Sequence, residues 1–294
     1  MLPWPDIAAQ ISAITGTPFT ANKVAAVGGG CINQSYRIES SGQCFFVKLN
    51  NAGNLPMFEA EAAGLQEIHN SRTLRVPAPV CWGKNEASAW LVLECLEIGS
   101  AGSSGAASLG QGLAAMHRFP SVKFGWVRNN TIGTTPQVNK SSADWIQFWR
   151  EHRLGYQLRL AQANGYTRKL QTLGERLLAE LTVFFPRTPP VPSLLHGDLW
   201  GGNYAFDSAG QPVLFDPAIY YGDRETDLAM TELFGGFSAT FYAAYQEAYP
   251  LDPGYAIRKT LYNLYHILNH LNLFGGGYLN QAEQMMGRLH AEIR

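Results

Sequence analysis

Apolar and polar residues alternate between Val24 and Leu49, and this period of two predicts β-strands. Ser40–Gly42 supplies one turn and the glycines at 28–30 supply another, so three strands are expected here. The predicted elements of the first hundred residues are an amphipathic helix over 5–14, these three strands, a helix over 56–70, and strands over 79–82 and 90–93. The pattern therefore predicts a small, mostly antiparallel sheet with one inserted helix.

The pattern changes after a Gly- and Ser-rich stretch over 97–105, which has few bulky residues and is typical of a hinge. Beyond it apolar residues recur with the helical period, interrupted by short strands near 194–195 and 204–215. The predicted helices lie near 107–118, 142–162, 167–183, 224–234, 238–248, 255–273 and 279–292. We therefore expect an α+β fold with two lobes. The N-lobe, residues 1–97, is a small antiparallel sheet with one key helix. The C-lobe, residues 98–294, is larger and mainly helical.

Composition narrows the class of protein. The chain has 294 residues, of which 46% are hydrophobic and 15% charged, as in an ordinary globular protein. A net charge of −1 argues against an electrostatic nucleic-acid or membrane binder. The start of the chain lacks the features of a secretory signal and no apolar run is long enough to span a bilayer, so we expect a cytoplasmic protein. The four cysteines have no C-x-x-C spacing, which predicts neither a zinc site nor a disulfide framework.

The segment SLLHGDLWGGNYAFDSAGQPVLFDPA, over 193–218, carries the clearest chemistry. Asn203 follows Asp198 by five residues, and Asp216 ends a short apolar strand. Protein kinases have the same Asp-to-Asn spacing, and their metal-binding aspartate also follows a hairpin later. Phosphoryl transfer needs a carboxylate that orients the acceptor hydroxyl, here Asp198, and oxygen ligands for Mg²⁺, here Asn203 and Asp216. The spacing therefore predicts an ATP- and Mg²⁺-dependent kinase.

The N-terminal strands can be tested against this prediction. A glycine triplet at a strand–strand turn lies where a kinase covers the phosphates of ATP, although it is not the pattern G-x-G-x-x-G. The loop residues predicted to bind nucleotide are Gly28, Gly29, Gly30, Cys31 and Asn33. Lys48 follows on the third strand, where a lysine would bind the α- and β-phosphates.

That lysine requires a carboxylate from the next helix, which offers Glu59 and Glu61. At 100° per residue Glu61 shares the apolar face of the helix, so we choose Glu61 as the partner of Lys48 and expect Glu59 to be solvated. The run after the strand over 90–93 lies where kinases bind adenine through backbone groups, and it includes Glu94 and Leu96.

Several protein-kinase features are missing: Gly197 replaces the arginine of the catalytic loop, Asp216-Pro217 replaces D-F-G, and no A-P-E follows. The H-G-D-x-x-x-x-N form resembles aminoglycoside and choline kinases. The resemblance then sharpens, because most of the chain is similar to the fructosamine-kinase (ketosamine 3-kinase) family. The segments that carry this resemblance are GGGCINQSYRI, FVKLN, MFEAEAAGL, LLHGDLWGGN, FDPAIYYGDRETDLAMTELFGGF and LYHILNHLNLFGGGY.

The resemblance implies ATP-dependent phosphorylation of the 3-hydroxyl of a sugar joined to an amine (a ketoamine). The product then decomposes and frees the amine, which amounts to deglycation. Ribulosamines, erythrulosamines and fructosamines are all candidate substrates, on free or protein-bound amines, and these residues do not rank them.

By the same analogy Asp198 accepts the proton of the 3-hydroxyl. Trp200 is either a wall for the sugar or core packing, and the acceptor loop is expected over 220–225. The residues of that loop predicted to contact substrate are Tyr220, Tyr221, Asp223 and Arg224. Asp227 is expected to anchor the catalytic loop through hydrogen bonds. His266 and His270, four apart on a helix, are expected to line the pocket or fill the core rather than bind a metal.

Cys31 leaves two interpretations open. It is either a reduced loop cysteine in a monomer or, as the resemblance to the family implies, a thiol whose oxidation links two chains and slows the enzyme. Two rival functions also remain. One is a small-molecule kinase of the aminoglycoside or choline type. The other is a nucleotide-binding pseudokinase scaffold, against which the complete set of catalytic residues argues.

Overall fold

The computed structural model describes residues 2–28, 32–40, 42–185 and 189–293. By its internal contacts the chain divides into two compact units, which are described separately. Unit 1 contains residues 1–105 and 204–217, and unit 2 contains residues 106–203 and 218–294. The hairpin that ends in Asp216 therefore packs as part of unit 1, although it lies in the second half of the sequence.

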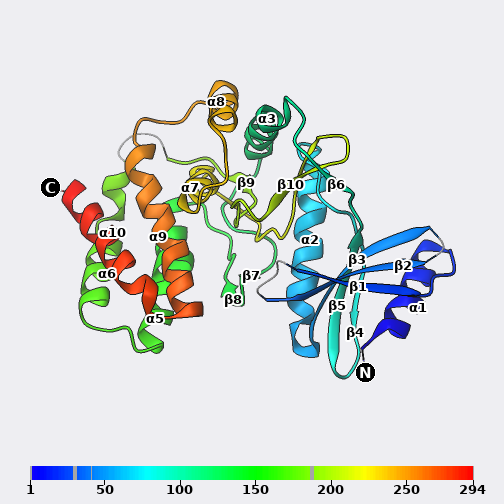
Figure 1. Cartoon of the computed structure of the whole chain (residues 1–294). Coiled ribbons are helices and arrows are strands. Elements are labelled where there is room, and N and C mark those ends of the chain that lie inside the picture. The colour runs from blue at the N-terminus through cyan, green and yellow to red at the C-terminus, as the bar shows by residue number, and fades with distance from the viewer. Residues whose placement is uncertain (1, 29–31, 41, 186–188, 294) are drawn as a thin grey trace. The chain divides into compact units, whose positions relative to one another are not determined.

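Unit 1 is built on an antiparallel sheet with the strand order β1-β2-β3-β5-β4. Its strands are β1 (Lys23–Val27), β2 (Gln34–Ser40), β3 (Gln43–Asn51), β4 (Pro79–Lys84) and β5 (Ser88–Glu94). Helix α1 (Trp4–Thr15) lies against one face, where Ile7 and Ile11 are buried with Val47 and Val92. Helix α2 (Leu55–Ser71) packs on β4 and β5, and Figure 1 shows it on the side of the sheet opposite α1. The alternation of β3 therefore directs Val47 toward α1 and its neighbour Lys48 toward α2.

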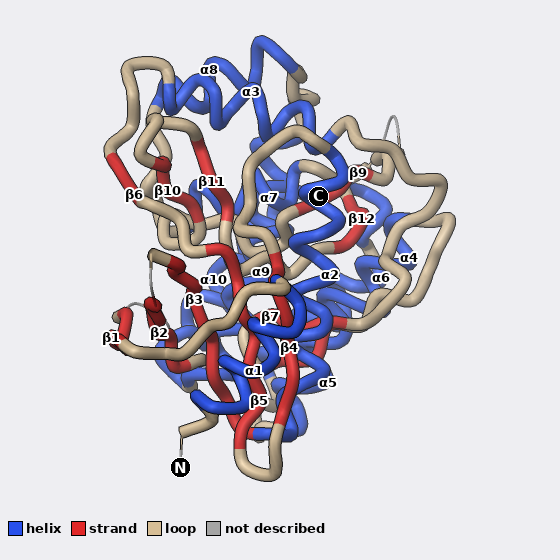
Figure 2. The backbone as a smooth tube through the Cα atoms, turned by 90° about the vertical axis from the view of Figure 1, so that its right-hand side faces the viewer, coloured by secondary structure: helices blue, strands red, loops and turns tan. Residues whose placement is uncertain are grey.

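A second, three-stranded sheet completes unit 1. Strand β6 (Ile98–Gly99) pairs with β10 (Tyr204–Asp207), which forms a hairpin with β11 (Pro212–Leu214). Figure 2 shows these three strands side by side. The pairing fixes the hairpin within unit 1, and Asp216 follows two residues after β11.

Unit 2 is mainly helical, with α9 (Tyr255–Phe274) in contact with α5 (Gly155–Ala163), α7 (Glu225–Leu233) and α10 (Leu279–Glu292). The helices of its other parts are α3 (Gly105–His117), α4 (Trp145–Trp149), α6 (Lys169–Ala179) and α8 (Ala239–Ala248). Two small ladders accompany the helices: β9 (Ser193–Leu195) with β12 (Tyr220–Gly222), and β7 (Asn130–Ile132) with β8 (Thr135–Gln137). Eleven residues of α9 are buried, including all nine from Leu261 to Asn269, so the middle of this helix is enclosed on every face.

The predicted α+β class is confirmed, and every helix and strand predicted from periodicity is present within a few residues. The predicted helix over 142–162 is divided into α4, a π-helical turn at Arg150–Leu154, and α5. Strands β6, β7, β8 and β12 were not predicted, because two or three residues carry no measurable alternation. Among the described residues, none of the helices is long and apolar enough to cross a bilayer.

Cysteine spacing predicted no disulfide framework, and this prediction missed one disulfide. Cys44 and Cys95 form a disulfide with 5.6 Å between their Cα atoms, whereas Cys81 is buried and free. The two half-cystines lie 51 residues apart in the sequence, and the pairing of β3 with β5, which places Phe45 opposite Glu94, brings them together. Spacing along the chain could not show this contact, because it depends on strand pairing.

Candidate active site

In unit 1, Lys48 makes two ion pairs from the face of the sheet that α2 covers. Its Nζ lies 2.5 Å from Oε1 of Glu61 and 2.5 Å from Oδ1 of Asp216. The side chains of Lys48 and Glu61 are almost fully buried, whereas that of Asp216 is half exposed, at 52%. Two carboxylates, one from α2 and one from the end of the β10–β11 hairpin, therefore meet at the ammonium group that β3 supplies.

The choice of Glu61 over Glu59 as the partner of Lys48 is confirmed. Glu61 lies on the face of α2 that carries Phe58, Leu65 and Ile68, all of which are fully buried. Helical geometry places residues three and four apart on one face, so packing of these apolar residues turns Glu61 toward the sheet.

Electrostatics keep Lys48 charged. Burial by itself would lower the pKa of Lys48, but the negative charges of Glu61 and Asp216 outweigh this effect and raise the pKa above its ordinary value. The ammonium is thus a permanent cation near neutral pH, suited to binding the oxygens of a polyphosphate.

In unit 2, the segment predicted to be the catalytic loop follows β9 and is held by Asp227 from the first turn of α7. The backbone N–H of His196 donates to Oδ2 of Asp227 at 2.7 Å, and that of Gly197 donates to Oδ1 at 2.8 Å. The predicted anchoring role of Asp227 is therefore confirmed. Although burial opposes ionisation, hydrogen bonds from His117 and from the backbone of Gly197 hold the pKa of Asp227 below its ordinary value.

His117 was missed by the sequence analysis. Its Nε2 lies 3.2 Å from Oδ2 of Asp227 and its Nδ1 lies 2.8 Å from the hydroxyl of Tyr245. Burial lowers the pKa of His117, so the neutral ring donates from Nε2 to the carboxylate. The residues are 110 positions apart, and a lone histidine at the end of a helix gave no signal of this contact.

Gly197 is required by the backbone of the loop. Its φ of 82° is in the left-handed region, and a Cβ atom there would lie 2.1 Å from the carbonyl oxygen of Ala218. The amide of Ala218 in turn donates to the carbonyl of His196 at 2.9 Å. An arginine, as in protein kinases, could not occupy this position.

Asp198 and Asn203 are brought together by the loop. Nδ2 of Asn203 donates to the carbonyl oxygen of Asp198 at 2.8 Å and lies 3.3 Å from its Oδ2 atom. With its amide nitrogen used in this way, Asn203 presents its Oδ1 atom as an acceptor.

The donor set fits a hard divalent cation. The amide oxygen of Asn203 and the half-exposed carboxylate of Asp216 are ligands of the kind that Mg²⁺ prefers, and Mg²⁺ in nucleotide sites also keeps water and phosphate ligands. In the part of the chain that the structure describes, no group of three or more His, Cys, Asp and Glu residues could hold a metal. Asn203 belongs to unit 2 and Asp216 to unit 1, and each unit thus offers one oxygen ligand of this kind.

The segment predicted as an acceptor loop is partly a strand. Tyr220–Gly222 forms β12, and Tyr220 is buried with its ring 3.9 Å from the guanidinium carbon of Arg153. Strand pairing with β9 was invisible in the sequence because β12 has three residues. The substrate-binding role of Tyr220 and Tyr221 stays a prediction.

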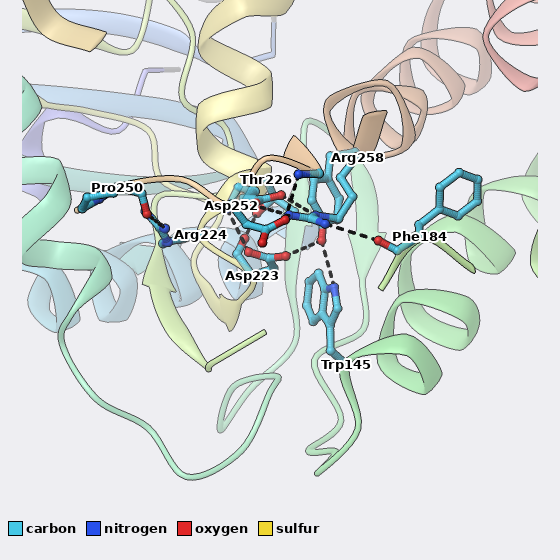
Figure 3. Close-up of polar contacts among 11 residues, drawn as sticks. Trp145, Phe184, Asp223, Arg224, Thr226, Pro250, Asp252 and Arg258 are labelled. Carbon is cyan, nitrogen blue, oxygen red and sulfur yellow. Dashed lines mark hydrogen bonds and ion pairs between the residues drawn. The ribbon is translucent and has the colours of Figure 1, made fainter. Parts of the chain in front are cut away.

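A buried ionic network follows β12, and Figure 3 shows its polar contacts. Oδ2 of Asp223 accepts a hydrogen bond from the hydroxyl of Tyr262 at 2.5 Å, while Arg258 makes a two-pronged contact with Glu225 at 2.7 and 2.8 Å. Arg224 donates to the carbonyl oxygens of Tyr249 and Pro250. These contacts fix the start of α7, which carries Asp227. Roles of Asp223 and Arg224 in substrate binding stay predictions.

The other predicted substrate residues have distinct environments. Trp200 is 39% exposed, and its ring lies over Gly202, where a Cβ would approach ring atoms to 2.4 Å. His266 is buried, and burial, together with the neighbouring His270, lowers its pKa to about 3, so it is neutral. His270 donates from Nδ1 to the carbonyl of His266 at 2.8 Å. Trp200 is thus not core packing, and the two histidines belong to no metal cluster among the described residues.

The predicted nucleotide loop is described only in part. Gly29, Gly30 and Cys31 lie outside the described residues. Oδ1 of Asn33 accepts a hydrogen bond from Nδ2 of Asn50 at 2.8 Å. At the end of β5, the amide of Glu94 donates to the carbonyl of Ala78 at 2.8 Å, and the adenine-binding role of Glu94 and Leu96 stays a prediction.

Comparison with known proteins gives these features a context. The model of the fructosamine kinase family matches residues 3–292. The chain belongs to the fructosamine kinase family. A probable ketoamine kinase of Synechocystis is 49% identical, with 97% of this chain and 96% of that protein covered.

A chloroplastic protein-ribulosamine 3-kinase of Arabidopsis thaliana is 44% identical over 88% of this chain and 80% of its own length. The crystal structure of a candidate fructosamine-3-kinase of Haemophilus somnus matches with a TM-score of 0.89 and 27% identity, covering 97% of each chain. The family, the fold and the resemblance seen in the sequence therefore agree.

Proposed function

We propose that this protein is an ATP- and Mg²⁺-dependent kinase that phosphorylates the 3-hydroxyl of ketoamines. The observation that carries the proposal is the Lys48–Glu61–Asp216 constellation, a buried lysine with one buried and one half-exposed carboxylate. A buried cation with a half-exposed acidic neighbour suits the phosphates and metal of a nucleotide. Membership of the fructosamine kinase family supports this choice over other uses of such a cluster.

In the proposed reaction the 3-hydroxyl oxygen attacks the γ-phosphorus of ATP as the bond to the β-phosphate oxygen breaks. Asp198 accepts the proton of the hydroxyl, and ADP leaves with the electron pair of the broken bond. Lys48 binds phosphate oxygens and offsets their charge. Asp227 holds the loop so that the Asp198 carboxylate needs little reorganisation during the reaction.

Asn203 and Asp216 would hold Mg²⁺, which supplies electrostatic stabilisation of the phosphates when it is bound. Asn203 also orients Asp198 through its amide nitrogen, so one side chain would serve both the base and the metal.

The substrate class rests on relatives. Proteins 49% and 44% identical to this chain are named a ketoamine kinase and a protein-ribulosamine 3-kinase. We therefore place ribulosamines first among the candidate sugars, with erythrulosamines and fructosamines after them, on free or protein-bound amines. An aminoglycoside or choline kinase and a pseudokinase scaffold remain the rivals.

The direct test is ADP release with Mg-ATP and a panel of ribulose-lysine, erythrulose-lysine, fructose-lysine, choline and kanamycin. We expect turnover on the ketoamines alone, with the phosphate on O3. Turnover only on choline or kanamycin would overturn the substrate class, and binding of Mg-ATP without any turnover would favour the scaffold.

The matched variant is Asp198→Asn, which keeps the shape of the side chain but removes the base. We expect ketoamine turnover to fall by at least ~100-fold while Mg-ATP still binds. Wild-type turnover in this variant would refute the role of Asp198.

Two further proposals concern assembly. We expect a monomer under reducing conditions and a disulfide-linked dimer through Cys31 after oxidation. Non-reducing gels after treatment with hydrogen peroxide test this. Equal amounts of dimer in wild type and Cys31→Ser would exclude Cys31 as the link.

A further inference from the structure

Arg75, in the segment between α2 and β4, contacts three separate parts of unit 1. Its Nη2 lies 2.8 Å from Oε1 of Glu94, and its Nη1 lies 2.6 Å from Oδ2 of Asp207. Its carbonyl oxygen accepts a hydrogen bond from the amide of Leu214 at 2.9 Å. One residue thus joins the end of β5 to both strands of the β10–β11 hairpin.

The first contact fixes the connector that follows β5. Glu94 uses its other oxygen, Oε2, to accept from the amide of Ala78 at 3.2 Å, and its own amide donates to the carbonyl of Ala78. Glu94 is therefore held at both its backbone and its side chain. Leu96, the second residue predicted to bind adenine, follows two positions later.

The second contact fixes the turn of the hairpin. Asp207 is buried, and its Oδ1 atom accepts from the amides of Ala209 and Gln211 at 3.0 and 2.9 Å. The hydrogen bond from Gln211, with help from Arg75, holds the pKa of Asp207 below its ordinary value. The carboxylate is therefore ionised, and its second oxygen is used for Arg75.

The third contact lies close to the predicted metal ligand. Arg75 forms a parallel β-bridge with Val213, and its carbonyl oxygen accepts a hydrogen bond from the amide of Leu214. Leu214 lies two residues before Asp216 in the sequence. Asp216 has a φ of 51°, a left-handed conformation that an aspartate tolerates but does not favour. A firmly held β11 would help to keep the Asp216 carboxylate beside Lys48.

We propose that Arg75 is a positioning residue for the nucleotide, coupling the adenine-binding connector to Asp216. This inference rests on the proposed function. Arg75 acts through its neighbours: the guanidinium spans Glu94 and Asp207 with two nitrogens, and the backbone holds β11. Lysine carries the same charge as a single point and could not bridge both carboxylates in the same way.

A simpler reading is a surface ion pair of little consequence, since the Arg75 side chain is 44% exposed. The two readings differ in what they predict for nucleotide binding. A merely structural pair would change stability alone, whereas a positioning residue would change affinity for the nucleotide in the folded protein.

The test measures the Kd of magnesium-AMP-PNP by calorimetry on the full chain, well below the unfolding temperature of each variant. We expect Arg75→Met to raise this Kd by about 3- to 10-fold, and Arg75→Lys to give a smaller increase. Arg72→Met is the matched control, because it removes an exposed arginine that makes no ion pair among the described residues. The Kd of the nucleotide for this variant should stay within about twofold of the wild-type value.

A double-mutant cycle assigns the effect to the bridge. Glu94→Gln should weaken binding in the wild-type background but add less than about twofold in the Arg75→Met background, because the bridge is already lost. Equal Kd values for wild type, Arg75→Met and Arg75→Lys would overturn the inference. The readout needs no acceptor, so a wild-type protein that binds the nucleotide but phosphorylates no ketoamine would refute the proposed function alone.

Discussion

At the scale of single residues, Asp227 holds two backbone N–H groups of the catalytic loop with its two oxygens. Asp227→Asn keeps the shape of the side chain but turns an NH₂ group toward one of these donors. We expect the free energy of unfolding to fall by about 1–3 kcal/mol, because a buried donor loses its acceptor. We also expect kcat to fall by about 10- to 100-fold, since Asp198 loses its fixed position.

Urea unfolding and steady-state kinetics measure both effects of Asp227→Asn. Glu247→Gln removes an exposed carboxylate of the same unit and should leave both quantities unchanged. If the Asp227→Asn variant had a normal kcat, the loop at His196 and Gly197 would need no anchor from α7.

His266 predicts a dependence of stability on pH. Its folded pKa of about 3 lies below the ordinary value of 6.5, because the ring is buried and has His270 and Arg153 nearby, with only Asp227 opposing. Below pH 6.5 the unfolded chain binds a proton that the folded chain does not, so stability is lost as pH falls from 6.5 toward 3. At pH 5.5 this loss amounts to about 1.4 kcal/mol.

The measurement is the free energy of unfolding at pH 7.5 and 5.5 for wild type and His266→Gln. Carboxylates titrate alike in both proteins, so the difference between their pH slopes isolates His266. We expect the variant to lose about 1.4 kcal/mol less than wild type over this range. Identical slopes would mean that the ring is accessible to protons in the folded state.

Residues of the site were predictable where local spacing carries the chemistry. Asp198 and Asn203 are five positions apart, and the helical face of α2 singled out Glu61 over Glu59. Arg75 and His117 could not be found in this way, because their partners lie more than a hundred residues away in the sequence, at Asp207 and Asp227. Their contacts follow from packing, which a single sequence does not display.

At the scale of elements, α2 carries two carboxylates, Glu59 and Glu61, on different faces, so their roles can be compared within one helix. Glu61→Gln removes a charge beside Lys48, whereas Glu59→Gln removes one from another face of the same helix. We expect Glu61→Gln to lower kcat/KM for Mg-ATP by about 10-fold or more, because a mobile lysine binds phosphates less well. Glu59→Gln should change it by less than about twofold, and equal effects of the two substitutions would contradict the assignment.

The disulfide between β3 and the end of β5 should stabilise unit 1. It closes a loop across a sequence separation of 51 residues, which restricts the unfolded chain and contributes up to about 4 kcal/mol in the chain-entropy treatment. We expect a reductant to lower the urea midpoint of the oxidised protein, and Cys44→Ser to remove this sensitivity. Peptide mapping without reduction should recover Cys44 linked to Cys95. A midpoint in Cys44→Ser that still responds to reductant would place the effect at another cysteine.

Across the whole molecule, the order of elements was predictable but their grouping into units was not. Periodicity placed the sheet early and the helices late, and a Gly- and Ser-rich stretch predicted a boundary near residue 97. Contacts instead extend unit 1 to residue 105 and add residues 204–217 to it. The strands of this hairpin are three and four residues long, so no pattern within them shows that β10 pairs with β6.

This grouping has an energetic consequence that amide hydrogen exchange can measure. Ile38 is fully buried in the core of unit 1, and Leu268 is fully buried in α9 of unit 2. Replacing either by alanine should cost about 2–5 kcal/mol of stability, chiefly in the unit that contains it. If the β10–β11 hairpin is part of unit 1, Ile38→Ala should speed amide exchange in residues 204–214 more than in β9 or β12. Leu268→Ala should instead speed exchange in β9 and β12 more than in residues 204–214. If Leu268→Ala speeds exchange in residues 204–214 more than Ile38→Ala does, the hairpin is stabilised together with unit 2. The proposed coupling of Arg75 to Asp216 through β11 would then lose its support.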